Sequence, residues 1–149
     1  MEASENEYKA FIGKKADYYI EKWTEMEKRH TKTSWNWGAF LFGLLWMLYR
    51  KMYFYTLIAV SILCGIGIIE SFLGIGDVFD AILSFIFCLL FGIFGNYLYH
   101  RYTENKILRI KRECKEDSSL IAELARRGGT TWVAPILLVL LILWATLSV

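Results

Sequence analysis

Small and polar side chains recur at every fourth residue along one apolar stretch of the sequence. The repeat consists of Asp80, Ser84, Cys88, Gly92 and Asn96, and on a helix these positions share one face. In lipid, small side chains let two helices approach closely, and an asparagine can form hydrogen bonds to a neighbouring helix. The same face could instead form a polar track for an ion or a small solute. Helix packing and conduction are both open interpretations of this pattern.

Basic and tryptophan residues flank the apolar stretches and suggest contacts with lipid headgroups. A basic side chain close to an anionic leaflet contributes about 1 kcal/mol to membrane attraction. Tryptophan is enriched at the membrane interface, where its ring is buried and its N–H stays hydrated. We expect headgroup contacts at Trp35, Trp37, Arg50, Lys51, Arg109, Lys111 and Arg112.

Patterns that carry catalysis or bind a metal do not occur in the sequence. There is no C-x-x-C, H-E-x-x-H, Walker A or G-x-S-x-G motif. His30 and His100 have no Cys or His at zinc-binding spacing. We therefore expect no enzymatic activity, no metal and no cofactor. The net charge of +2 is too small to indicate a nucleic-acid partner.

The apolar residues, 56% of the chain, form long blocks instead of stripes. Residues 52–69, 81–99 and 132–149 contain no charged residue. As helices they would be roughly 27–28 Å long, close to the ~30 Å hydrocarbon thickness of a bilayer. The pattern predicts three transmembrane helices.

A fourth apolar segment, residues 35–49, is too short for a normal span and is joined to the next block by Arg50 and Lys51 alone. Two residues cannot connect two antiparallel membrane helices. We expect a re-entrant or interfacial segment, the alternative being that it crosses the bilayer.

Charged helices are predicted for residues 1–34 and 100–131. In the first, Ser4 and Glu7 have the spacing of a capping box, and Gly13 is a possible break. Its apolar stripe, Tyr8, Ile12, Tyr19, Trp23 and Met26, could pack on a membrane surface or on the protein's own helices. The second has eight Lys/Arg against five acids, and we expect it to be a basic helical loop.

The distribution of charge predicts the orientation. Loops rich in Lys and Arg stay in the cytoplasm, which places the N-terminus and residues 100–131 inside. The loop over residues 70–80 has three acids and no base, which places it outside together with the C-terminus. The expected fold class is an all-α membrane protein with a single domain over residues 1–149.

The run Trp35-Asn36-Trp37-Gly38-Ala39-Phe40, followed by Trp46, Tyr49, Arg50 and Lys51, resembles the DUF2628 family of small bacterial membrane proteins. The "RRGGTTW" sequence at 126–132 is also similar to that family. The resemblance implies membrane residence and a bacterial source. Together with the predicted spans, it leads us to expect a multi-pass protein of the bacterial cytoplasmic (inner) membrane. It implies no activity and no functional residue.

The leading functional hypothesis is non-enzymatic binding of a partner protein or of membrane lipid at the cytoplasmic face. A homo-oligomer is expected, because three spans are few to enclose a polar interior and small-residue faces need partners. The alternative is a homo-oligomeric channel or transporter for an ion or small polar solute, using the face from Asp80 to Asn96.

Overall fold

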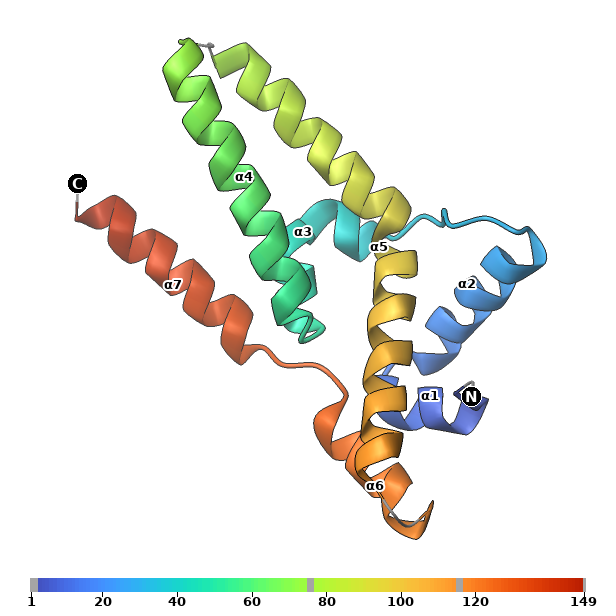
Figure 1. Ribbon diagram of the computed structural model, residues 1–149. Helices are drawn as coiled ribbons and strands as arrows, with labels where there is room; N and C mark the ends of the chain where they lie inside the picture. Colours follow the sequence, from blue (N-terminus) through green and yellow to red (C-terminus); the bar gives the residue numbers. More distant parts are fainter. Residues whose placement is uncertain (1–2, 75–76, 115–116, 149) are drawn as a thin grey trace. The chain divides into compact units, whose positions relative to one another are not determined.

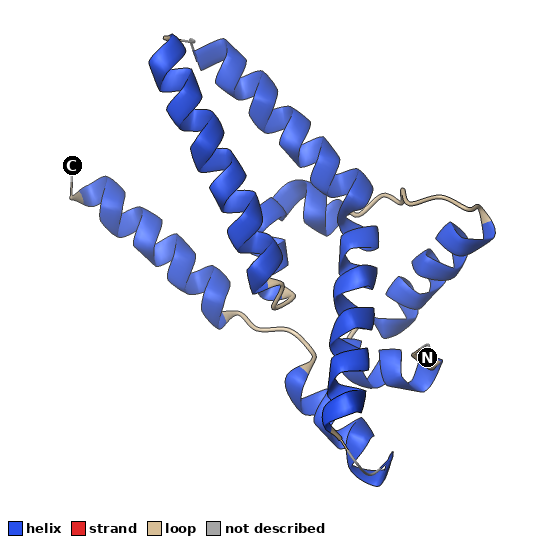
Figure 2. Cartoon of the chain, viewed as in Figure 1, coloured by secondary structure: helices blue, strands red, loops and turns tan. Residues whose placement is uncertain are grey.

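The computed structural model describes residues 3–74, 77–114 and 117–148, and over these residues the chain is entirely helical (Figures 1 and 2). Seven helices are seen in this part of the chain, with no strand. Their bounds are α1 Glu5–Ile12, α2 Ala16–Lys28, α3 Trp37–Tyr49, α4 Tyr53–Leu73, α5 Asp77–Glu113, α6 Asp117–Arg127 and α7 Val133–Leu147.

The chain divides into two compact units. The polar unit comprises Met1–Trp35 and Ile93–Thr130, and the apolar unit comprises Asn36–Gly92 and Thr131–Val149. Of the chain's 17 Lys/Arg and 15 Asp/Glu residues, the apolar unit contains only Arg50, Lys51, Glu70, Asp77 and Asp80. Charge is therefore concentrated in the polar unit.

Exposed apolar surface has the opposite distribution. Among the described residues, every exposed large hydrophobic side chain except Tyr18 and Ile121 belongs to the apolar unit. The polar unit instead has a buried core of its own, formed by Phe11, Ile12, Ala16, Tyr19, Trp23, Met26, Tyr99, Tyr102, Ile107, Ile110, Leu120 and Leu124. In its burial pattern this unit resembles a small water-soluble domain.

The first helix of the polar unit begins and ends as its sequence indicates. The predicted capping box is present: the Ser4 side chain accepts from the Glu7 backbone N–H, and the Glu7 carboxylate accepts from the Ser4 N–H. Gly13, with φ +66°, ends α1. Of the predicted stripe, Ile12, Tyr19, Trp23 and Met26 are buried in the polar unit's own core. The stripe therefore packs on the protein's own helices and not on a membrane surface.

Two long-range contacts join α1 to the rest of the polar unit. Lys111 of α5 forms an ion pair with Glu7, with Nζ and Oε1 2.7 Å apart, and Glu7 is only 7% exposed. At the end of α6, the Gly129 N–H donates to the Phe11 carbonyl oxygen at 2.7 Å. A Cβ atom at Gly128 would lie 2.0 Å from the same oxygen, so this approach requires glycine.

Two helices are long and apolar enough to cross a membrane, by length and composition. These are Tyr53–Leu73 and Val78–Glu113. Only 6% and 11% of their most apolar windows are buried inside the chain. The core helix of a soluble protein would be mostly buried, so these two helices do not have that role here.

The predicted boundaries of the apolar blocks need correction. The expected outer loop at residues 70–80 is mostly helical: α4 continues to Leu73, where Gly74 with φ +62° caps it, and α5 begins at Asp77. Residues 75 and 76 lie outside the described residues. The expected third span is shorter than predicted, because α7 covers only 15 residues, Val133–Leu147. Val149, its predicted end, is also outside the described residues.

Helix α3 is a broken helix held at both ends within the apolar unit. The Asn36 side chain accepts from the Ala39 N–H (2.9 Å) and caps its start. Gly43 has non-helical torsion angles (φ 44°, ψ −112°), so the helix is interrupted in the middle. At its end Lys51 adopts φ +60°, and the Met52 N–H donates to the Met47 carbonyl. This is the hydrogen bond of a Schellman motif, which turns the chain sharply into α4.

The start of α7 is attached to the end of α3. The Thr131 N–H donates to the Tyr49 carbonyl oxygen at 3.0 Å. The rings of Tyr49 and Trp132 are 4.7 Å apart between centroids. The first residues of α4 and α7 therefore both lie beside the end of α3.

Replacing Gly128 by alanine should destabilise the polar unit by about 1–3 kcal/mol or more, the usual cost of overpacking. The new Cβ would collide with the Phe11 carbonyl and separate α6 from α1. The matched control is Gly67→Ala in α4, where a Cβ meets nothing within 4 Å. Thermal unfolding of both variants in detergent provides the measurement. Equal stability of Gly128→Ala and the parent protein would contradict the contact.

The Glu7–Lys111 ion pair makes stability depend on pH. Burial by itself raises the pKa of the Glu7 carboxyl, but hydrogen bonds from Lys111 and the Ser4 backbone, with the Lys111 charge, hold the pKa below its ordinary value of 4.5. A lowered pKa stabilises the fold above the unfolded-state value, and that stabilisation is lost as the pH falls through the folded-state value. The stability difference between wild type and Glu7→Gln should therefore be largest near pH 7 and shrink below pH 4.5.

Denaturant unfolding of the two proteins from pH 7 to pH 3 measures this difference. Glu21→Gln is the control, because Glu21 is exposed and has no ion pair among the described residues. A wild-type advantage over Glu7→Gln that does not change across this range would refute the role of the ion pair.

Candidate functional site

The residues of the predicted polar track lie along α5 but differ in exposure. Asp80 and Ser84 are exposed, Cys88 is half-buried, and Gly92 and Asn96 are buried. Their environment changes from open surface at the start of the helix to a packed interior at residues 92–96. The choice between packing and conduction for the whole face stays a prediction.

At the buried end of this face, the segment before α3 runs along α5. In the polar unit, the Ser34 N–H donates to the Ile93 carbonyl at 3.0 Å. The Asn96 amide donates to Ser34 Oγ (3.1 Å) and to the Trp35 carbonyl (3.3 Å). In the apolar unit, the Asn36 N–H donates to the Gly92 carbonyl at 2.8 Å. Asn96 thus satisfies backbone groups of a non-helical segment.

The residues expected at lipid headgroups have different surroundings. Trp37 is 64% exposed, and Arg109 and Arg112 are exposed on α5, although Arg109 pairs with Glu113 at 3.1 Å. Trp35 and Lys51 are half-buried. By contrast, Arg50 is only 3% exposed and lies over the Tyr49 ring, and Lys111 is engaged by Glu7. Arg50 and Lys111 therefore present little free charge.

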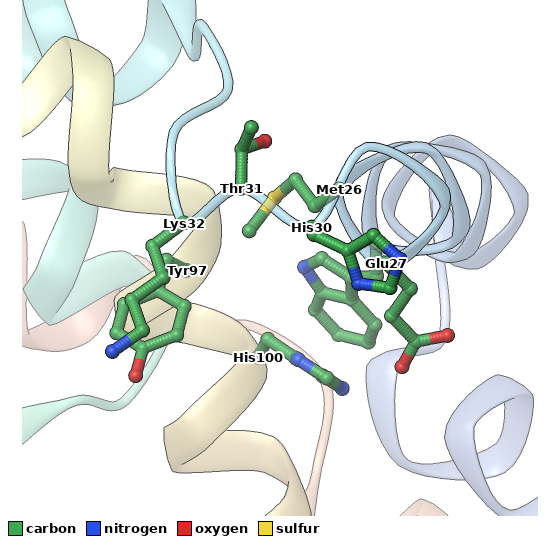
Figure 3. A pocket seen from close by; sticks show the side chains of 8 residues that line it. Met26, Glu27, His30, Thr31, Lys32, Tyr97 and His100 are labelled. Atoms are coloured by element: carbon green, nitrogen blue, oxygen red, sulfur yellow. The ribbon is translucent and has the colours of Figure 1, made fainter.

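An open groove of about 500 Å³ lies in the polar unit, between the end of α2, the segment after it, and α5. Sequence reasoning missed this site. Figure 3 shows Lys32 and Tyr97 together on one side, Glu27 and His30 on the other, and His100 below them. The lining residues are Trp23, Met26, Glu27, His30, Thr31, Lys32, Tyr97 and His100.

The floor of the groove is an aromatic cluster centred on Trp23, which is 4% exposed. The Trp23 indole N–H donates to the Asn96 carbonyl oxygen at 3.0 Å. Its ring stacks on His100, with centroids 4.6 Å apart, and the Tyr8 hydroxyl lies 3.3 Å from His100 Nε2. The floor is therefore closely packed, and the Trp23 indole N–H and His100 Nε2 have partners within the protein.

The rim of the groove is shaped by the end of α2. His30 has φ +50°, with hydrogen bonds from its own N–H to the Glu27 carbonyl and from the Thr31 N–H to the Met26 carbonyl. These two bonds form a Schellman motif. Glycine is the usual residue at its left-handed position, which histidine adopts less readily. The turn brings Lys32 to α5, where its ammonium lies 5.7 Å from the Tyr97 ring centroid.

Two signals in the sequence point toward this groove in retrospect. His100 directly follows the apolar block 81–99, and His30 and Lys32 come four and six residues after Met26, the last member of the amphipathic stripe. Neither signal predicts that the two segments meet, because 67 or more residues separate them in the chain.

Comparison with known proteins identifies one family. A family model described as "Protein of unknown function (DUF2628)" matches residues 4–104, whereas no curated protein and no solved structure matches the chain. The match spans the capping box, the segment before α3, and all residues that line the groove. The "RRGGTTW" sequence at 126–132 lies beyond it. Since the match covers more than half of the chain, this protein belongs to the DUF2628 family.

Proposed function

We propose that this chain is a non-enzymatic, multi-pass protein of the bacterial cytoplasmic membrane, whose polar unit binds a partner protein or lipid at the cytoplasmic face. The separation of charge from exposed apolar surface supports this proposal most strongly. Among the residues that the structure describes, the apolar unit exposes twenty-nine large hydrophobic side chains. A contiguous apolar surface of this kind in a soluble monomer would be exceptional, and a bilayer would cover it.

The proposed topology has three spans, α4, the apolar part of α5, and α7, with the N-terminus in the cytoplasm. Helix α7 is short, at about 22 Å from a rise of 1.5 Å per residue. Trp132 and Trp144, 66% and 70% exposed, lie near its two ends. Such exposed tryptophans are typical of membrane interfaces. A short helix can be accommodated by local thinning of the bilayer.

Helix α3 is proposed to enter the bilayer without crossing it. Its N-cap residue, Asn36, donates to the Gly92 carbonyl oxygen, and a Cβ at Gly43 would lie 3.6 Å from the Phe91 ring. Its last residues contact the start of α7 and turn directly into α4. If α3 crossed, its start would lie near the opposite end of α4, beside the beginning of α5. The contacts with residues 91–92 favour the re-entrant arrangement.

Binding is preferred to conduction because of how Asn96 is used. Its amide donates to Ser34 and Trp35, so the residue at the inner end of the proposed track stabilises the segment before α3. Homo-oligomerisation is part of the proposal, because Gly65 in α4 has nothing within 4 Å of a Cβ position. Such an open small-residue site allows a second helix to approach closely.

Reporter fusions test the proposed topology. Fusions after residues 75 and 149 should report an external location, and a fusion after residue 114 should report a cytoplasmic one, since basic segments are retained inside. The native protein should remain in the membrane pellet after carbonate extraction. A cytoplasmic signal at residue 75 or 149 would contradict the three-span arrangement. Release of the native protein by carbonate would contradict membrane integration altogether.

A further inference from the structure

The groove of the polar unit carries opposite charges on opposite sides. Lys32 lies against Tyr97 on one side, and Glu27 lies beside His30 on the other (Figure 3). Among the described residues, neither charge belongs to an ion pair, although most other charges of this unit do, such as Lys22 with Glu25 and Arg29 with Glu25. Both side chains are exposed and can reach a ligand.

Two residues that line the groove lie at the end of the apolar block that is proposed to span the membrane. Tyr97 is within the apolar block 81–99 of α5, and His100 is the first residue after it. If that block spans the bilayer as proposed, these residues lie where hydrocarbon gives way to headgroups. Trp23 and Tyr97, which line the groove, belong to the residue types enriched at that depth.

We infer that the groove binds the zwitterionic headgroup of a phospholipid with a primary ammonium, the phosphoethanolamine headgroup. The phosphate lies at Lys32, whose ammonium donates to its oxygens. The headgroup ammonium lies at Glu27, whose carboxylate accepts its N–H groups. The volume of about 500 Å³ is within the usual range for small-ligand sites. This inference rests on the proposed membrane location.

Other headgroups match the groove less well. An anionic phosphatidylglycerol headgroup would satisfy Lys32 but leave the Glu27 carboxylate beside a ligand with no cation. A phosphatidylcholine headgroup has a quaternary ammonium, which has no N–H to donate to Glu27. An exposed carboxylate such as Glu27 forms a charge-assisted hydrogen bond only with a ligand that brings an N–H donor, so these two headgroups gain nothing from it. The arrangement of charges therefore selects a primary ammonium.

Native mass spectrometry of the full-length chain tests the inference. The protein in detergent is mixed with dioleoyl phosphatidylethanolamine, phosphatidylcholine or phosphatidylglycerol, and the fraction carrying a retained lipid is measured. Wild type should retain phosphatidylethanolamine most strongly. Glu27→Gln and Lys32→Gln should each reduce this retention by about tenfold, the scale of one charge-assisted hydrogen bond. Glu27→Gln should also shift the preference to phosphatidylglycerol, because Lys32 then remains as the groove's cation.

Glu21→Gln and Lys28→Gln are matched controls, since both residues are exposed on α2 and do not line the groove. They should retain phosphatidylethanolamine as wild type does, and circular dichroism should show all four variants folded. Equal retention in groove variants and controls, or a wild-type preference for phosphatidylglycerol or phosphatidylcholine, would overturn the inference and leave the proposed membrane location intact. Release of the native protein by carbonate would overturn both.

Discussion

The proposed membrane location depends on one physical constraint, the large apolar surface that the apolar unit exposes. Helices α4 and α7 and the first part of α5 expose most of their Leu, Ile, Val and Phe side chains, and the described part of the chain does not cover them. At about 25 cal/mol per Å² of apolar surface, no monomer would leave so much exposed in water. A bilayer covers such helices without further protein, because their backbone hydrogen bonds are satisfied within each helix. The concentration of charge in the other unit is consistent with this constraint.

The non-helical segment before α3 is the difficult part of such a protein. Its backbone groups must find partners near an apolar environment, since an unpaired group there costs several kcal/mol. Ser34 and Asn36 donate to carbonyls of α5, the Asn96 amide donates to Ser34 and Trp35, and the Asn36 side chain caps α3. Asn36 and Asn96 are both buried, at 3% and 0% exposure. Two buried asparagines thus allow the chain to change direction where α5 leaves its apolar block.

Local sequence signals predicted the local structure well. The capping box at Ser4, the break at Gly13 and a charged helix after the second apolar block follow from short-range rules and are present. Helix ends were predicted less well. The acids Glu70, Asp77 and Asp80 were taken as a loop, although Glu70 lies near the end of α4 and Asp77 and Asp80 lie in the first turn of α5.

Long-range contacts could not be predicted from one sequence. The Glu7–Lys111 ion pair, the approach of Gly128 to Phe11, and the stacking of Trp23 on His100 each join residues more than 75 positions apart. The groove depends on such contacts, so its charged residues were read as parts of separate helices. The headgroup contacts expected at Arg50 and Lys111 show the same difficulty, because the sequence shows only that both residues are basic. In the structure Arg50 is buried and Lys111 forms an ion pair with Glu7.

The central claim is that the apolar unit lies in lipid and the polar unit in water. Spin labels placed singly in a cysteine-free variant in nanodiscs test it most directly, by comparing collisions with oxygen, which partitions into lipid, and with a water-soluble nickel chelate. Labels at Ile62, Ile86 and Leu140, all exposed in the apolar unit, should collide mainly with oxygen. Labels at Tyr18, Glu21 and Ile121, exposed in the polar unit, should collide mainly with nickel. Nickel-dominated collisions at Ile62, Ile86 and Leu140 would contradict the claim.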